Sequence, residues 1–163
     1  MKPAARLACA TDLSGVLGLF EASEVSHSAE PRSRAEQIWR ETLDRLGVSI
    51  FISEAGQNIV ATCMLVVAPN LLRSGCQHGF IENVVTHPDF RGQGYGSAVL
   101  AAALERAWQE DCHHVLLQSG RADPRVRAFY ERAGFVPGLR TAYAAMRPSR
   151  PMSAIGRKLP LRT

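Results

Sequence analysis

A glycine-rich run in the middle of the chain has the residue types of a phosphate-binding loop. The run reads Arg91-Gly92-Gln93-Gly94-Tyr95-Gly96-Ser97. It follows a strand-like segment, 80–86, and opens a segment with helical periodicity. Backbone N–H groups at a helix start are unpaired and lie at the positive end of the helix dipole, so they stabilise an anion. Glycines let a phosphate approach the backbone, and Arg91 adds positive charge. We therefore predict a pyrophosphate cradle.

Two familiar phosphate loops do not fit this run. A P-loop requires Gly-Lys-Ser/Thr, whereas Gly96 is followed directly by Ser97. The dinucleotide fingerprint G-x-G-x-x-G would need a glycine at position 97 or 99, where the chain has Ser97 and Val99. The remaining alternative is a helix that is entered through flexible glycines and holds no ligand.

The spacing Arg91-x-x-Gly94-x-Gly96 resembles the acetyl-CoA pyrophosphate loop of the GNAT superfamily of N-acetyltransferases. Segment 81–86 resembles the fourth strand of that family, and the run from Asp123 to Phe135 resembles its second signature segment. The resemblance implies a single-domain α/β fold. Its sheet would be mixed and mostly antiparallel, with helices on both faces and a central pair of parallel strands that splay apart.

The resemblance also implies how the donor acetyl-CoA would be bound. The pantetheine arm would pair with the backbone of the strand, and the pyrophosphate would lie on the loop. The residues expected to contact the donor are Val84, Val85, Thr86, Arg91, Gly92, Gln93, Gly94, Gly96, Ser97 and Asp123. The family often has asparagine where this chain has Asp123, and aspartate lacks the amide donor. A direct contact of Asp123 with the donor is therefore open.

Two residues are candidates for proton transfer. In the family the acceptor amine attacks the thioester directly, and a general base must first remove a proton from the amine. Glu82 is the candidate base, and strand alternation places it on one face with Phe80 and Val84, opposite Val85. The alternative role for Glu82 is a substrate-binding or ion-paired carboxylate. Tyr130 matches the family tyrosine that protonates the leaving thiolate; the alternative is a core aromatic of an amphipathic helix.

The acceptor and the activity itself leave alternatives. A small-molecule amine such as an amino sugar, a polyamine or an antibiotic is the preferred acceptor, and a peptide amine is the second choice. A nonenzymatic acyl-CoA-binding regulatory module would keep the glycine loop but show no turnover. Nucleic acid is not expected as a partner, because the chain has no recognisable binding motif.

The elements that must position these residues follow from hydrophobic periodicity and from turn and cap signals. We expect strand 5–10, a helix beginning at Thr11 or Asp12, and a second helix with a capping box at Ser33 and Glu36. The expected hairpin pairs 48–53 with 59–67. Strand 80–86, the helix after the glycine loop, strand 115–119, a helix capped by Asp123 and a last strand over 141–146 complete the order.

The cysteine pattern gives no sign of a metal centre. The chain has four cysteines, Cys9, Cys63, Cys76 and Cys112. They show no C-x-x-C spacing, and the histidines beside Cys76 and Cys112 do not complete a four-ligand set. We expect Cys9 and Cys63 to be small buried thiols, because their sequence neighbours are apolar.

Length and charge place these features in one domain. The chain of 163 residues suits a single acetyltransferase domain over 1–147, followed by a basic tail over 148–163. Residues 1–120 carry 9 basic and 13 acidic side chains, whereas residues 121–163 carry 10 basic and 2 acidic ones. No apolar run is long enough for a membrane span, and no signal peptide is recognisable, so we expect a cytoplasmic protein. A homodimer is possible through the last strand.

Overall fold

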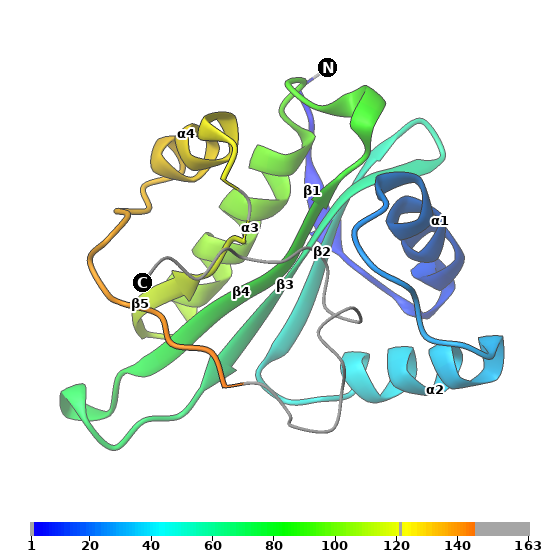
Figure 1. The fold of residues 1–163 in the computed structure, drawn as a ribbon. Helices are drawn as coiled ribbons and strands as arrows, with labels where there is room; N and C mark the ends of the chain where they lie inside the picture. Colours follow the sequence, from blue (N-terminus) through cyan, green and yellow to red (C-terminus); the bar gives the residue numbers. More distant parts are fainter. Residues whose placement is uncertain (1, 121, 146–163) are drawn as a thin grey trace. The chain divides into compact units, whose positions relative to one another are not determined.

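The computed structural model describes residues 2–120 and 122–145. Contacts divide the chain into two compact units, Met1–Leu117 and Gln118–Thr163. The first unit is built on a five-stranded sheet in the order β1-β2-β3-β4-β5 (Figure 1). The prediction of an α/β fold with a mixed sheet is confirmed. Within the described ranges, no helix has both the length and the apolar composition needed to cross a bilayer.

The first unit contains five strands, three α-helices and three short 3-10 turns among its described residues. The strands are β1 (Ala5–Leu7), β2 (Val48–Ala55), β3 (Asn58–Ala68), β4 (Gln77–Thr86) and β5 (Cys112–Leu117). The helices are α1 (Leu13–Ser23), α2 (Arg32–Leu43) and α3 (Tyr95–Gln109), with short 3-10 turns η1 (Ala10–Asp12), η2 (Arg73–Gly75) and η3 (Pro88–Phe90).

Four of the strands are antiparallel and the last pair is parallel. β1 pairs with β2, β2 with β3 and β3 with β4 in antiparallel register, so the predicted hairpin is confirmed. β4 and β5 are parallel. Because parallel neighbours need a crossover connection, α3 carries the chain from the end of β4 back to the start of β5.

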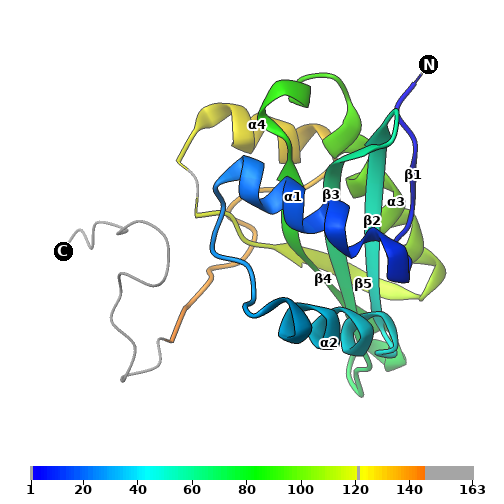
Figure 2. The same cartoon turned by 90° about the vertical axis from the view of Figure 1, so that its right-hand side faces the viewer.

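The helices cover both faces of the sheet (Figure 2). On one face, a buried cluster joins α1 and α2 to the sheet; it comprises Leu13, Val16, Leu19, Trp39, Ile52, Ile59 and Val85. On the other face, the thiol of Cys63 on β3 donates a hydrogen bond to the carbonyl oxygen of Val99 on α3 at 3.3 Å. Ile52 and Cys63 occupy opposite faces, because Cys63 is paired with Phe51, the neighbour of Ile52.

Three local predictions near the N-terminal helices need correction. α2 begins at Arg32 directly after Pro31, so Ser33 lies inside the helix and forms no capping box. The spacing of Trp39, Leu43 and Leu46 predicts a helix that runs to Gly47, but α2 ends at Leu43, and Leu46, in the turn that follows, is 97% exposed. Cys9 is exposed rather than buried, since it precedes η1 at the surface. Apolar neighbours or residues suited to helix caps led to each of these predictions. In the structure, α2 begins and ends at other residues than predicted, and Cys9 lies at the surface.

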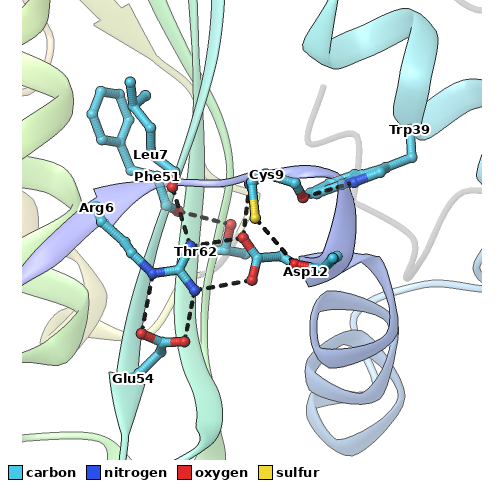
Figure 3. A network of polar contacts seen from close by, with 9 residues as sticks. Arg6, Leu7, Cys9, Asp12, Trp39, Phe51, Glu54 and Thr62 are labelled. Atoms are coloured by element: carbon cyan, nitrogen blue, oxygen red, sulfur yellow. Dashed lines mark hydrogen bonds and ion pairs between the residues drawn. The ribbon is translucent and has the colours of Figure 1, made fainter.

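A polar network fastens β1 to β2 and to the start of α1 (Figure 3). The guanidinium of Arg6 donates to both carboxylate oxygens of Asp12, at 2.7 and 2.9 Å, and to both of Glu54, at 3.2 and 2.7 Å. The backbone N–H of Cys9 also donates to Asp12 at 2.7 Å. The Arg6 guanidinium lowers the pKa of the buried Asp12 carboxyl to about 2, against the opposing effect of its burial. The network therefore holds a charged Asp12 inside the fold.

The second unit contains the helix α4 (Pro124–Arg132). Asp123 caps this helix, since its carboxylate accepts a hydrogen bond from the N–H of Arg125 at 2.9 Å, and the predicted cap is confirmed. Gly134 follows the helix with a positive φ of 95°, as expected of a helix-stop glycine. Residues 141–145 form no strand, so that prediction is wrong for them, and Met146 and the tail 148–163 lie outside the described residues.

Candidate active site

β4 loses its neighbour β5 halfway along its length. The parallel pairing runs from Gln77, opposite Cys112, to Ile81, opposite Leu117, where β5 ends. β4 continues to Thr86 and stays paired with β3 on its other side. The edge of β4 from Glu82 to Thr86 that faces away from β3 therefore has no strand partner within this unit. Its backbone N–H and C=O groups are available to an extended ligand.

A β-bulge lies at the point where the two strands part. Glu82 is opposite Met64 and Val85 is opposite Thr62, so Asn83 and Val84 both lie opposite the single residue between them. Asn83 has a positive φ of 53°, a conformation that asparagine tolerates better than most residues. The sequence analysis did not identify this bulge.

The bulge changes which residues share a face of the sheet. Met64 and Thr62 are two residues apart on β3, so their partners Glu82 and Val85 point to the same side. The prediction that Glu82 and Val85 face opposite sides is therefore wrong, because the extra residue breaks the alternation. Val85 belongs to the buried cluster under α1 and α2, so Glu82 also faces that side. Its pairing with Met64, like that of Phe80 with Val66, confirms that Glu82 and Phe80 share a face.

The side chain of Glu82 is exposed. We find no ion pair or hydrogen bond to its carboxylate among the described residues. An ion-paired role inside this unit is thus not supported. The carboxylate stands beside the unpaired edge of β4, free to contact a substrate or a water molecule.

The glycine loop connects the end of β4 to α3. Gly92 and Gly94 have φ values of 76° and 94°, in the left-handed region that favours glycine. Gly94 directly precedes α3, and Ala98 is the first helical residue whose N–H bonds to a carbonyl one turn earlier, that of Gly94 at 2.9 Å. The N–H groups of the first helical turn, at Tyr95, Gly96 and Ser97, therefore have no acceptor within the helix. The loop has the geometry of the predicted anion cradle.

Side chains of the loop hold its shape. The Nε of Arg91 donates to the carbonyl oxygen of Thr86 at 3.3 Å, which ties the loop to the end of β4. The side-chain amide of Gln93 donates to the carbonyl oxygen of Asp89 at 2.9 Å, and the Nδ1 of His87 accepts from the N–H of Asp89 at 3.3 Å. The side chain of Gln93, which was predicted to contact the donor, thus stabilises the loop through a hydrogen bond within it. Arg91 remains exposed, and its terminal nitrogens form no hydrogen bond or ion pair with any residue that the structure describes.

Two of the predicted site residues belong to the second unit. The carboxylate of Asp123 accepts from the guanidinium of Arg125 at 2.8 Å in addition to capping α4. The ring of Tyr130 is half-buried and packs on Phe129 and Phe135, with centroid distances of 5.0 and 6.1 Å. The other predicted residues, from Glu82 to Ser97, form one continuous stretch of the first unit.

The most buried cysteine is not suited to nucleophilic catalysis. Burial raises the pKa of the Cys63 thiol to about 12, so the thiolate is not formed near neutral pH. Its hydrogen bond to the Val99 carbonyl holds the thiol in the core. This agrees with a reaction that uses no enzyme thiol.

The model of the Acetyltransferase (GNAT) family matches residues 16–135. The chain belongs to the GNAT family. It is therefore an N-acetyltransferase, and acetyltransferases of this family use acetyl-CoA as the acetyl donor.

Three similar proteins illustrate the family membership. The glucosamine 6-phosphate N-acetyltransferase of Trypanosoma brucei brucei is 30% identical over 126 residues, which is 77% of this chain and 73% of that protein. A protein of Oryza sativa subsp. japonica described as a probable glucosamine 6-phosphate N-acetyltransferase is 37% identical over 78 residues, 48% of this chain and 45% of that one. A solved structure of an Agrobacterium tumefaciens protein described as an acetyltransferase is 37% identical, with a TM-score of 0.82 over 88% of this chain and 99% of that chain.

Proposed function

We propose that this GNAT enzyme transfers the acetyl group of acetyl-CoA to the primary amine of a small molecule. The observation that carries the proposal is the unbroken succession of the unpaired β4 edge, the glycine loop and the first turn of α3. The β4 edge suits the amide-containing arm of the donor, and the glycine loop with the free N–H groups suits its pyrophosphate. The residues present therefore fit acetyl-CoA.

The donor supplies an activated acetyl thioester when it is bound. The nitrogen of the acceptor amine attacks the carbonyl carbon of that thioester, so a C–N bond forms, the C–S bond breaks, and the sulfur leaves as a thiolate. The amine must be neutral to attack, although most amines are protonated near neutral pH. In our proposal Glu82 accepts the amine proton, directly or through water, and the Tyr130 hydroxyl donates a proton to the sulfur. A backbone N–H on the β4 edge stabilises the developing oxyanion.

The position of Glu82 supports its role as the base. Its carboxylate is exposed and unpaired within the described residues, and it adjoins the point where β5 leaves β4. The bulge at Asn83 directs it to the same face as Val85, toward the side covered by α1 and α2. An acceptor that binds on this face would meet Glu82 beside the proposed thioester.

We propose an amino sugar phosphate as the acceptor. The support is the relative of Trypanosoma brucei brucei, which is named for acetylation of glucosamine 6-phosphate and which aligns with 77% of this chain. The rice relative is described by the same activity over a shorter stretch. Other small amines and peptide amines are the competing acceptors.

The test is a purified-protein assay in two stages. Acetyl-CoA is first titrated calorimetrically, and free thiol release is then followed with glucosamine 6-phosphate, glucosamine, an aminoglycoside, a polyamine and a peptide amine. Fastest turnover with glucosamine 6-phosphate, with a product heavier by one acetyl group, would support the proposal. Turnover with another amine alone would replace the acceptor, and binding without turnover would favour an acyl-CoA-binding regulatory module. An absence of acetyl-CoA binding would overturn the proposed use of the glycine loop.

A further inference from the structure

A pair of histidines at the start of β5 lies away from the proposed active site. The Nδ1 atoms of His113 and His114 are 3.1 Å apart. His113 is exposed, and His114 is half-buried. His114 is paired in register with His78 on β4, and the centroids of those two rings are 4.9 Å apart. Three imidazoles thus gather at the end of β4 and β5 opposite to the end where the strands part.

We propose that the Nδ1 atoms of His113 and His114 together bind one divalent first-row transition-metal ion. Metal–nitrogen bonds to imidazole are about 2.0–2.1 Å long. Two such bonds span the observed 3.1 Å at an angle of roughly 95–102°. This angle lies between those of square-planar or octahedral geometry and that of tetrahedral geometry, so Cu²⁺, Ni²⁺ and Zn²⁺ all fit the spacing.

The protonation of the two imidazoles is compatible with metal binding. A hydrogen bond between two Nδ1 atoms requires that one of them carries the proton. A metal ion displaces that proton, which moves through solvent to Nε2 of the same ring, so that both rings are neutral Nε2–H tautomers when the ion is bound. Both Nδ1 atoms must be unprotonated to bind the ion.

The electrostatics of the surrounding residues favour a cation. α3 ends at Gln109, so the negative end of its dipole lies just before the histidines in the chain. Glu110 and Asp111 follow. Their two carboxylates add negative charge to the turn that precedes the histidines.

Of these two carboxylates, that of Glu110 forms an ion pair. Arg106 on α3 forms an ion pair with Glu110 at 2.6 Å, which leaves Asp111 as the main source of the negative field. The described residues hold no cluster of three or more His, Cys, Asp or Glu side chains arranged for a metal. Water must therefore complete the coordination, and we expect a labile site open to solvent rather than a closed structural one.

The test is calorimetric titration of the full chain, without an affinity tag, with Zn²⁺ and with Cu²⁺ at pH 7.5. We expect one ion per chain, and at least tenfold weaker binding in His113→Ala. His27→Ala is the matched control, because His27 is exposed in the connection between α1 and α2 and should leave the Kd unchanged. Titration of His78→Gln shows whether the neighbouring ring contributes a third ligand.

The outcomes separate this site from the proposed acetyl transfer. His113 is exposed, so its variant should keep the fold, which far-UV circular dichroism and a thermal melt would verify. Its acetyl-CoA affinity should match that of the wild type, whether or not glucosamine 6-phosphate is the acceptor. No ion bound at one per chain, or equal affinity of wild type and His113→Ala for both ions, would overturn the inference.

Discussion

Replacement of Asp12 by asparagine should destabilise the fold at neutral pH and do so less at acidic pH. Folding lowers the pKa of this carboxyl from 3.8 to about 2. That difference corresponds to roughly 2 kcal/mol of stability at pH 7, which is an upper figure because the Arg6 side chain is partly exposed and its charge is screened by water. Asparagine keeps the size of the side chain and an oxygen that can accept from the Cys9 N–H, so the change removes mainly the charge.

The sign of the pH dependence follows from the lowered pKa. The stabilisation by Asp12 is fully present above the unfolded-state value of 3.8 and is lost as the pH falls toward 2. At pH 3 the folded form still binds fewer protons than the unfolded form, and about half of the free-energy difference remains. The gap between wild type and Asp12→Asn should therefore narrow from roughly 2 kcal/mol at pH 7 to about 1 kcal/mol at pH 3.

Urea unfolding followed by tryptophan fluorescence measures this gap. Trp39 is a suitable reporter, because it is buried and its indole N–H donates to the Cys9 carbonyl at 3.2 Å, next to the network. Glu54→Gln is the control: Glu54 bonds to the same Arg6 but is far more exposed, so its loss should cost about 0–1 kcal/mol. The reasoning is refuted if Asp12→Asn costs less than about 0.5 kcal/mol at pH 7, or if its cost is the same at pH 3.

Four further substitutions, with Gly56→Ala as the control, test the site and the fold. Gly94→Ala should weaken acetyl-CoA binding about tenfold or more, because alanine at the φ of 94° costs about 1–2 kcal/mol and shifts the loop. The control Gly56→Ala, at a φ of 63° in the β2–β3 turn, should leave the Kd for acetyl-CoA unchanged. Equal effects of the two substitutions on this Kd would contradict the cradle. Glu82→Gln should lower kcat about 10²-fold or more and leave the affinity for acetyl-CoA unchanged, and Tyr130→Phe should also lower kcat. A decrease in kcat of less than about fivefold in Glu82→Gln would exclude Glu82 as the base. Gly47→Ala should cost about 2–5 kcal/mol in urea unfolding, because the new Cβ would clash with the Val67 carbonyl oxygen. Gly56→Ala meets no atom within 4 Å and should cost only about 1–2 kcal/mol.

Local patterns in the sequence were sufficient for the glycine loop and the main elements. The alternation of β-branched residues predicted the hairpin that β2 and β3 form, and Asp123 before Pro124 predicted the cap of α4. The glycines before α3 predicted a helix start with free N–H groups, and Gly92 and Gly94 do adopt the backbone conformation that only glycine takes readily. Each of these features depends on neighbours within a few residues, which is the range over which backbone propensity acts.

Contacts between distant segments decided the rest. The bulge at Asn83 depends on how β4 aligns with β3, and it is this alignment that turns Glu82 and Val85 to the same face. Arg6 meets Glu54, 48 residues away, only because β1 pairs with β2. The histidine pair gains its third imidazole because β4 and β5 are adjacent in parallel register. The sequence by itself thus determined which residues could bind an anion and begin or end each element. Strand register and burial, which arise only when remote segments pack, determined which way the side chains point and which charges meet.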